Sequence, residues 1–209
     1  MSDATSVVFV VDDDPSVRSS LEALIESAGW SVRACASAHE FLSCPEVGVP
    51  SCLVLDVGLP DLNGLELQKR VAAERADMPV IFITGYGDVP MTVRAMKAGA
   101  VEFLIKPFDD EVLLEAIRRA LEQSHAELDR AAEMRVLQHC QASLTLREQQ
   151  VMRLVASGLL NKQVGTALGI SEITVKAHRG KVMRKMKAHS LAELVSMAGR
   201  LQLTAAEKG

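Results

Sequence analysis

The sequence predicts an α/β domain with a parallel sheet, followed by a smaller all-α domain. Short apolar runs alternate with helical patterns over the first 120 residues, and no strand-like run follows residue 144. The charge also changes sign: residues 1–120 carry 10 Lys and Arg against 19 Asp and Glu, whereas residues 144–209 carry 11 against 4. Strands that alternate with helices form a parallel sheet with helices on both faces. The basic second part suggests that this part alone meets a polyanion.

Five short runs are the strand candidates of the first domain. They are bounded by polar or turn-forming residues and lie at Val7–Val11, Ser31–Cys35, Cys52–Asp56, Val80–Thr84 and Val101–Ile105. Helical patterns separate them, near residues 15–28, 37–43, 64–75 and 89–98, and another begins near Asp109. The first and third runs are almost continuously apolar, as expected of strands buried on both faces. We therefore expect a flavodoxin-like, doubly wound (βα)5 domain with strand order 2-1-3-4-5.

The helical pattern that begins near Asp109 continues without Pro or Gly to about Gln141. It has no broad apolar face over residues 122–133. We interpret it as a helix that leaves the first domain and becomes a linker. The alternative is one longer helix packed entirely on the first domain. The predicted division is a first domain at 1–122, a helical linker at 123–143 and a second domain at 144–209.

Four short helices are predicted for the second domain. Residue pairs typical of capping boxes open the first and the last of them, at Thr145 with Glu148 and at Ser190 with Glu193. The second and third helices are expected at Asn161–Leu168 and Ser171–Met186, joined through Gly169 and Ile170. Their spacing is that of a helix-turn-helix motif. The expected fold of this part is an all-α, four-helix helix-turn-helix domain.

Composition narrows the classes of protein that fit. No apolar run approaches the roughly 20 residues that span a bilayer. The first residues lack the basic start and apolar stretch of a signal peptide. The spacing of the four cysteines matches no zinc-ligand pattern, which favours reduced thiols packed as small hydrophobes. We expect a cytoplasmic protein that does not associate with a membrane.

Polar residues lie at the carboxyl ends of four of the predicted strands. They are the run Asp12-Asp13-Asp14, then Asp56, Thr84 and Lys106. The carboxyl ends of neighbouring parallel strands meet at one edge of the sheet, so these side chains should converge. Clustered carboxylates repel one another unless a cation lies among them, and carboxylates with waters suit Mg²⁺. A carboxylate can also attack phosphorus.

In this interpretation Asp56 is the nucleophile, Lys106 the cation and Thr84 the hydroxyl that stabilise a phosphoryl group. Each residue alone has a simpler explanation: a helix cap for Asp14, a turn for Asp56 or Thr84, a surface charge for Lys106. Their coincidence at adjacent strand ends favours the joint site. A nucleotide-binding site would need a glycine-rich turn after the first strand, where Asp-Asp-Asp-Pro-Ser stands instead.

The motifs at residues 10–15, 55–64, 83–91 and 98–108 resemble the receiver domain of two-component response regulators, and the resemblance covers residues 5–122. It implies that Asp56 is the phosphoacceptor and that Thr84 and Lys106 contact the phosphoryl group. It also implies Mg²⁺ (or another divalent cation), with ligands from Asp12, Asp13, Asp56 and the carbonyl of Gly58. Phe103 would be the aromatic switch, or otherwise a core residue. The Lys106–Pro107 peptide would be cis. Gly58 is smaller than the family's usual residue there, which leaves the phosphate lifetime open.

The third helix of the second domain is strongly basic. Ile173, Val175, Val182 and Met186 are its expected apolar anchors, and a merely solvated charged face is the alternative. The segments at residues 144–148, 161–165 and 169–179 resemble the LuxR-type DNA-binding domain, and the whole architecture is similar to FixJ-like regulators, including those of the StyR type. By position, the base edges would face Lys176, Ala177 and Gly180, whereas the DNA phosphates would meet Arg179, Lys181 and Arg184. The last helix either packs within the domain or pairs two such domains.

The resemblance implies a response regulator that a sensor histidine kinase phosphorylates on Asp56. The product would dimerise, bind double-stranded promoter DNA and regulate transcription, as an activator, together with RNA polymerase. In this interpretation the protein is a phosphoryl acceptor, not a turnover enzyme. Two other classes remain open: an aspartyl-phosphate hydrolase that uses the same carboxylates, and a constitutive DNA-binding protein whose first domain only binds other proteins.

Overall fold

The chain forms two compact units in a computed structural model that describes residues 6–203. The boundary lies between Asp129 and Arg130, inside the long helix α5 (Asp110–Ala142). No helix within residues 6–203 combines the length and the apolar character that crossing a membrane requires.

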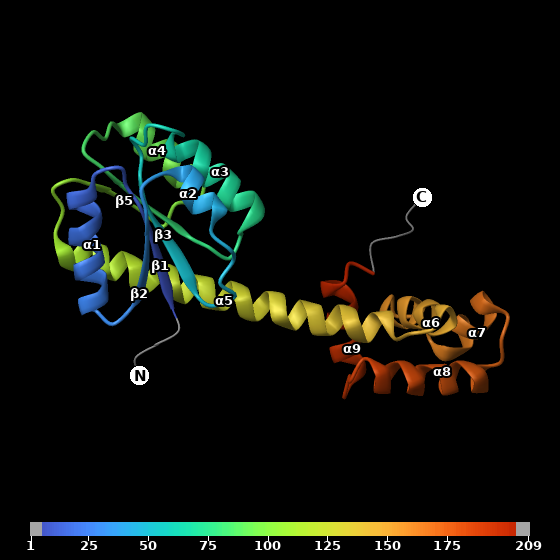
Figure 1. The fold of residues 1–209 in the computed structure, drawn as a ribbon. Coiled ribbons are helices and arrows are strands. Elements are labelled where there is room, and N and C mark those ends of the chain that lie inside the picture. The colour runs from blue at the N-terminus through green and yellow to red at the C-terminus, as the bar shows by residue number, and fades with distance from the viewer. Residues whose placement is uncertain (1–5, 204–209) are drawn as a thin grey trace. The chain divides into compact units, whose positions relative to one another are not determined.

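The first unit contains a parallel sheet of five strands in the order β2-β1-β3-β4-β5, as predicted (Figure 1). The strands are β1 (Val7–Val11), β2 (Ser31–Cys35), β3 (Ser51–Asp56), β4 (Val80–Thr84) and β5 (Glu102–Ile105). Their bounds differ from the predicted ones by at most one residue. Every residue of β3 and β4 is buried, whereas the edge strands β2 and β5 include exposed residues. The continuously apolar sequences are therefore those of the strands with a neighbour on each side.

Helices cover both faces of this sheet and form two separate apolar layers. The helices are α1 (Pro15–Ser27), α2 (Ala38–Ser43), α3 (Gly64–Glu74), α4 (Val89–Lys97) and the first part of α5. One layer joins α2, α3 and α4 to the sheet through residues such as Phe41 and Leu67, and the other joins α1 and α5 through Ile25 and Ile117 (Figure 1). Alternate residues of β1 enter opposite layers, as the twofold period of a strand requires.

Side-chain caps set where the first four helices begin. The Asp14 carboxylate accepts the Ser16 amide at 2.8 Å, and Pro15 occupies the first helical position, where no amide is needed. Ser37, Asn63 and Asp88 cap α2, α3 and α4 in the same way. The cap that the sequence suggested for Asp14 is confirmed.

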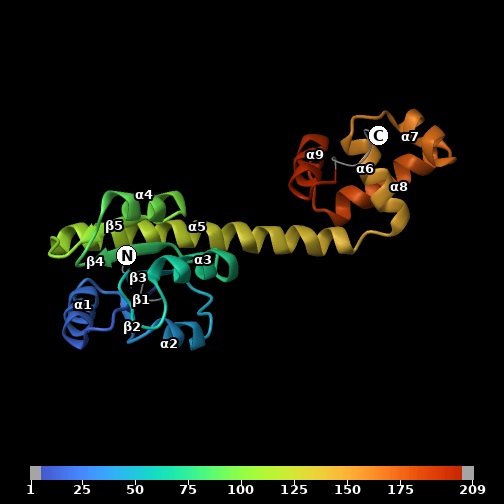
Figure 2. The same ribbon diagram turned by 90° about the horizontal axis from the view of Figure 1, so that it is seen from above.

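The second unit is helical and is built around a single apolar core. Its further helices are α6 (Leu146–Ala156), α7 (Asn161–Leu168), α8 (Glu172–Lys185) and α9 (Leu191–Arg200), which gather in a small bundle (Figure 2). The predicted capping box at Thr145 and Glu148 is present. Leu137 and Cys140 of α5, which lie in the range predicted as a linker, are buried in this core. The last turns of α5 are therefore part of the second unit's packing.

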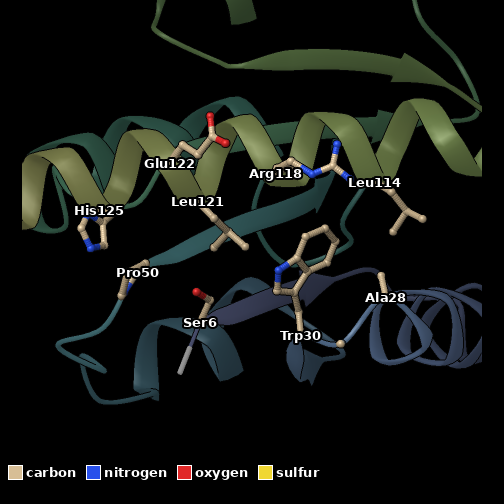
Figure 3. Close-up of a pocket in the computed structure, with 10 residues that line it drawn as sticks. Ser6, Ala28, Trp30, Pro50, Leu114, Arg118, Leu121, Glu122 and His125 are labelled. Atoms are coloured by element: carbon tan, nitrogen blue, oxygen red, sulfur yellow. The ribbon is translucent and has the colours of Figure 1, made fainter. Parts of the chain in front are cut away.

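A cavity of about 570 Å³ lies at the amino ends of the strands in the first unit. Leu114, Arg118 and Leu121 line it from α5, and Trp30 faces them from the turn before β2 (Figure 3). Ser6 and Pro50 precede β1 and β3, so the cavity lies at the end of the sheet opposite to Asp56. It is thus separate from the predicted phosphoryl site.

Candidate functional site

The carboxyl ends of four strands bring the predicted polar residues to one edge of the sheet. Asp12 follows β1, Asp56 ends β3, Thr84 ends β4 and Lys106 follows β5. In the strand register Asp56 pairs with Ile83, the residue before Thr84. Asp12 is 1% exposed, Asp56 7% and Thr84 4%. The sheet topology therefore holds two carboxylates in a region with little access to water.

The ammonium of Lys106 lies between the two buried carboxylates. Its Nζ is 2.6 Å from Oδ2 of Asp12 and 3.0 Å from Oδ1 of Asp56. Burial lowers the pKa of Lys106, but the hydrogen bonds with Asp12 and Asp56 outweigh burial, so its pKa lies above the ordinary value. Lys106 therefore stays charged near neutral pH, as a group that stabilises phosphoryl oxygens must. The peptide between Lys106 and Pro107 is cis, which confirms that expectation.

The second oxygen of Asp56 is held by the backbone of the following loop. Oδ2 accepts the amide of Gly58 at 2.6 Å. A Cβ at Gly58 would lie 3.1 Å from the same oxygen, so a larger residue there would crowd the carboxylate. Gly64 is required for a different reason, because its Cβ would lie 2.8 Å from the carbonyl oxygen of Asp56. The two glycines let the loop pass close to Asp56 on both sides.

The donor atoms around Asp56 fit a hard divalent cation. Asp12 and Asp56 offer carboxylate oxygens and Gly58 a carbonyl oxygen, and the single ammonium of Lys106 does not balance both carboxylates. Asp13 is exposed. Within residues 6–203, no three His, Cys, Asp or Glu side chains gather closely enough to hold a metal ion. Asp13 is therefore not drawn in as a third carboxylate here.

Thr84, predicted to contact the phosphoryl group, and Phe103, the predicted switch, lie on neighbouring strands. The Thr84 hydroxyl donates to the carbonyl of Tyr86 and accepts the Tyr86 amide, both at 3.2 Å. Phe103 is half-buried, and its ring centre lies 5.9 Å from that of Phe82. A Cβ at Gly87 would approach the Phe103 ring to 3.1 Å. The Thr84 hydroxyl thus bonds the loop after β4, and that loop lies against Phe103.

The basic helix α8 turns one face to solvent and the other to the core. Val175, Val182 and the following Met186 are buried, as expected of anchors. Ile173 is not an anchor, because it is 83% exposed. The expectation for Ile173 is wrong for a geometric reason: two helical residues are 200° of rotation, so positions 173 and 175 point in nearly opposite directions.

The residues predicted to meet DNA mostly lie on the exposed face of α8. Those that are exposed are Lys176, Ala177, Gly180, Lys181 and Arg184. Arg179 is half-buried, and its guanidinium donates to the side-chain oxygen of Asn161 at 3.2 Å. Arg179 therefore also ties α8 to the start of α7.

Two features that the sequence reasoning missed hold α8 in place. Gly165 permits the tight turn between α7 and α8, because its Cβ would lie 2.7 Å from the Ile170 carbonyl oxygen. Glu148 is 3% exposed and accepts the Lys185 ammonium at 2.7 Å, which links α6 to the last turn of α8. The hydrogen bond from Lys185 lowers the pKa of Glu148 to about 2. The capping-box pattern predicted Glu148, but not its partner.

The first unit contains similar contacts that no motif indicated. Arg18 donates to the backbone carbonyl of Asp12 at 2.7 Å, and the amide of Asp14 donates to the Asp12 carboxylate at 2.9 Å. The Asp61 carboxylate accepts the amide of His39 at 3.0 Å, at the start of α2. The Asp12–Asp14 bond is a local turn contact, whereas the bond between Asp61 and His39 joins residues 22 apart in sequence, whose proximity depends on the folded domain.

Two family models match the chain. The response regulator receiver domain matches residues 8–118, and the bacterial regulatory proteins of the luxR family match residues 142–198. Nodulation protein W of Bradyrhizobium diazoefficiens is 50% identical over 200 residues, which cover 96% of this chain and 88% of that protein. Transcriptional regulatory protein FixJ of Azorhizobium caulinodans is 48% identical over 195 residues, which cover 91% and 90%.

A solved structure agrees with these relatives. The low-resolution structure of the response regulator StyR is 48% identical, has a TM-score of 0.80, and covers 94% of this chain and 99% of its own. The fold, the two kinds of domain and the resemblance inferred from the sequence are thereby confirmed. The chain belongs to the FixJ-like response regulators, which join a receiver domain to a LuxR-type DNA-binding domain.

Proposed function

We propose that a sensor histidine kinase transfers a phosphoryl group to Asp56, and that this transfer controls promoter binding by the second unit. The observation that supports it best is the buried Asp12–Lys106–Asp56 arrangement, with the Lys106 ammonium 3.0 Å from the carboxylate that would react. A buried Asp that lies beside a charged hydrogen-bond donor is suited to attack an electrophilic phosphorus atom. The LuxR-type domain supplies the DNA-binding output.

The transfer forms a bond between phosphorus and a carboxylate oxygen of Asp56. It breaks the phosphorus–nitrogen bond of the kinase's phosphohistidine, and the imidazole leaves with the electron pair and takes up a proton. Lys106 and the amide of Gly58 already bond the Asp56 oxygens, and they would stabilise charge that develops on the phosphoryl oxygens. Bound Mg²⁺ would supply further positive charge at the same oxygens. Its proposed ligands are Asp12, Asp13, Asp56 and the Gly58 carbonyl.

The proposed switch begins at the Thr84 hydroxyl. Its present partners are the backbone groups of Tyr86, and a phosphoryl group on the neighbouring strand end offers a charged acceptor instead. Movement of Thr84 would draw the loop after β4 with it and let Phe103 repack. The contact between Gly87 and the Phe103 ring supports this coupling.

The surface formed by α4, β5 and α5 is the proposed dimer surface. Its exposed apolar residues are Val89, Val93, Met96, Ile105 and Val112, each at least 43% exposed. The three from α4 have the spacing i, i+4 and i+7 of one helical face. An apolar face of this kind on a receiver unit supports pairing with the same face of a second copy.

The dimer would place two α8 helices on successive major-groove half-sites, roughly one DNA turn apart. Lys176, Ala177 and Gly180 would face the base edges, and Arg179, Lys181 and Arg184 the phosphates. We further propose that the protein acts in the cytoplasm, activates transcription with RNA polymerase, and does not turn over a substrate. The proposed domains are 1–122 and 144–209, joined by helical residues 123–143, of which the last turns pack in the core of the second unit.

Acetyl phosphate tests the proposal without the kinase. With Mg²⁺, the intact mass should rise by one phosphoryl group, and Asp56→Asn should take up none. Phosphorylation should also raise the affinity for DNA selected by the protein from a random pool. Rapid release of phosphate with repeated turnover would instead favour a hydrolase. Unchanged mass, with DNA binding intact, would favour a constitutive DNA-binding protein.

A further inference from the structure

Ile173 is a large apolar side chain that the second unit does not bury. It is the second residue of α8, and 83% of it is exposed, whereas Val175 is fully buried. A buried isoleucine contributes about 1.5–3 kcal/mol to folding, and an exposed one contributes almost nothing. The stability of the unit therefore does not explain an isoleucine at position 173.

The position of Ile173 on α8 places it with the residues expected to face DNA. Relative to Ile173, the exposed residues Lys176, Ala177, Gly180 and Arg184 lie at i+3, i+4, i+7 and i+11. Residues at these spacings share one face of a helix. Ile173 thus occupies the amino-terminal end of that face, and in helix-turn-helix proteins the first residues of the recognition helix contact the base edges.

The major groove offers an isoleucine one matching chemical group. Guanine, cytosine and adenine present hydrogen-bond donors and acceptors at their groove edges, whereas thymine also presents its 5-methyl group. We propose that Ile173 contacts the methyl group of a thymine in the half-site and so contributes to sequence preference. The proposal rests on the DNA-binding function proposed above and assigns one specificity-determining residue to it.

The neighbouring side chains on this face support a close approach. Ala177 is small and Gly180 has no side chain, and a Cβ built at Gly180 meets nothing within 4 Å. Packing inside the unit therefore does not require glycine at position 180. The small residues at positions 177 and 180, in the middle of this face, let the helix backbone lie deep in the groove, where a branched apolar side chain can reach a base methyl.

The test compares thymidine with deoxyuridine, which lacks only the 5-methyl group of the base. A duplex is first selected from random DNA by the phosphorylated full-length protein, and each thymine of the half-site is then replaced in turn. At one position the loss of the methyl should weaken binding about fourfold, the equivalent of one buried methyl-sized group. With Ile173→Ala, the same replacement should have no effect. This pattern in a double-mutant cycle identifies the contact.

Leu146→Ala is the matched control, because Leu146 is 82% exposed but lies at the start of α6, outside α8. The fourfold methyl effect should persist in this variant. An equal methyl effect in the wild type and in Ile173→Ala would overturn the proposal, as would the absence of any methyl effect in the wild type. Failure to select any duplex would count against DNA binding itself, so the two failures are distinguishable.

Discussion

In the first unit, the side chains of the proposed phosphoryl pocket come from positions as distant in sequence as Asp12 and Lys106, and three of the four are buried. In the second unit, the residues proposed to face DNA come from a single helix, α8, and most are exposed. The pocket therefore exists only when the sheet is folded, because four of the five strands each contribute one residue at the carboxyl end. The DNA-facing surface needs only that one helix is held in the right orientation.

Both units contain a buried carboxylate bonded to a lysine, but the two pairs have different tasks. Lys106 bonds two carboxylates at the reactive edge of the sheet. Lys185 bonds Glu148 and the carbonyl of Ser143, which fixes the last turn of α8 against α6. The ion pairs of Lys106 are suited to phosphoryl chemistry, whereas the Lys185–Glu148 pair is suited to fixing the orientation of α8. Variants in the second unit should therefore alter DNA binding and leave phosphorylation of Asp56 unchanged.

The largest loss of stability is expected from Glu148→Gln, which removes the negative charge of the Glu148–Lys185 pair. Loss of one partner of a buried pair costs about 3 kcal/mol, and Lys185, which is 36% exposed, can still reach water. Chemical unfolding followed by circular dichroism should show a stability loss near this size at neutral pH. Trp30, the single tryptophan, lies in the first unit, so its fluorescence transition should not shift. A matching shift in both signals would contradict the independence of the two pairs.

The Glu148–Lys185 pair also predicts how the folding stability changes with pH. The pKa of Glu148 is about 2 in the folded chain and about 4.5 when unpaired. Because the folded value is the lower one, the stabilisation is fully present above pH 4.5 and is lost as pH falls towards 2. The stability difference between the wild type and Glu148→Gln should therefore stay constant from pH 7 to pH 5 and shrink below that. A difference that grows as the pH falls would contradict this assignment.

A somewhat smaller loss of stability is expected from Gly165→Ala, close to the turn that orients α8. The added Cβ would lie 2.7 Å from the carbonyl oxygen of Ile170, and this backbone atom cannot shift without a cost in free energy. Overpacking of this kind costs about 1–3 kcal/mol, partly offset by the better helix propensity of alanine, so we expect about 2 kcal/mol. DNA affinity should fall in a gel-shift assay, while acetyl phosphate still modifies Asp56. Gly199→Ala, with nothing within 4 Å, is the control.

The fold was predictable from sequence because its strongest signals are local. Continuously apolar runs marked β1 and β3, and the rule that ligands bind at the carboxyl ends of strands then brought Asp12, Asp56 and Lys106 together. The partner of each side chain was not predictable. Lys106 bonds two carboxylates at once, and that geometry depends on the folded sheet.

The errors in the second unit have simpler causes. Ile173 was expected among the anchors because it is apolar, although its helical phase relative to Val175 already indicated the opposite face. Packing of Leu137 in the second unit's core was not foreseen, because the polar stretch before it suggested that α5 had become a linker. Gly165 lies in a segment that resembles the LuxR-type domain, but its structural role gave no local signal, since the contact that requires glycine is with the backbone of Ile170.

The proposed dimer surface gives a test on the first unit. Val93→Glu places a charge in the apolar face of α4, where Val93 is 43% exposed, and burying that charge in a dimer is unfavourable. The dissociation constant of the phosphorylated dimer should rise at least about tenfold, equivalent to about 1.4 kcal/mol, in analytical ultracentrifugation. Phosphorylation itself should be unchanged. Ala72→Glu on α3 is the control, and an equal effect there would count against the α4 surface.

The smallest change in stability is expected from Gly180→Ala. This substitution should change stability and DNA affinity in opposite directions. The added Cβ meets nothing within 4 Å, so alanine should stabilise α8 by up to about 1 kcal/mol through its better helix propensity. Gly180 also lies on the face of Lys176 and Ala177, where extra bulk would meet the bases. We therefore expect a higher unfolding midpoint and a weaker affinity for the selected duplex. Glycine at this position would then serve the approach to DNA at the expense of the helix, and improved affinity in the alanine variant would exclude that explanation.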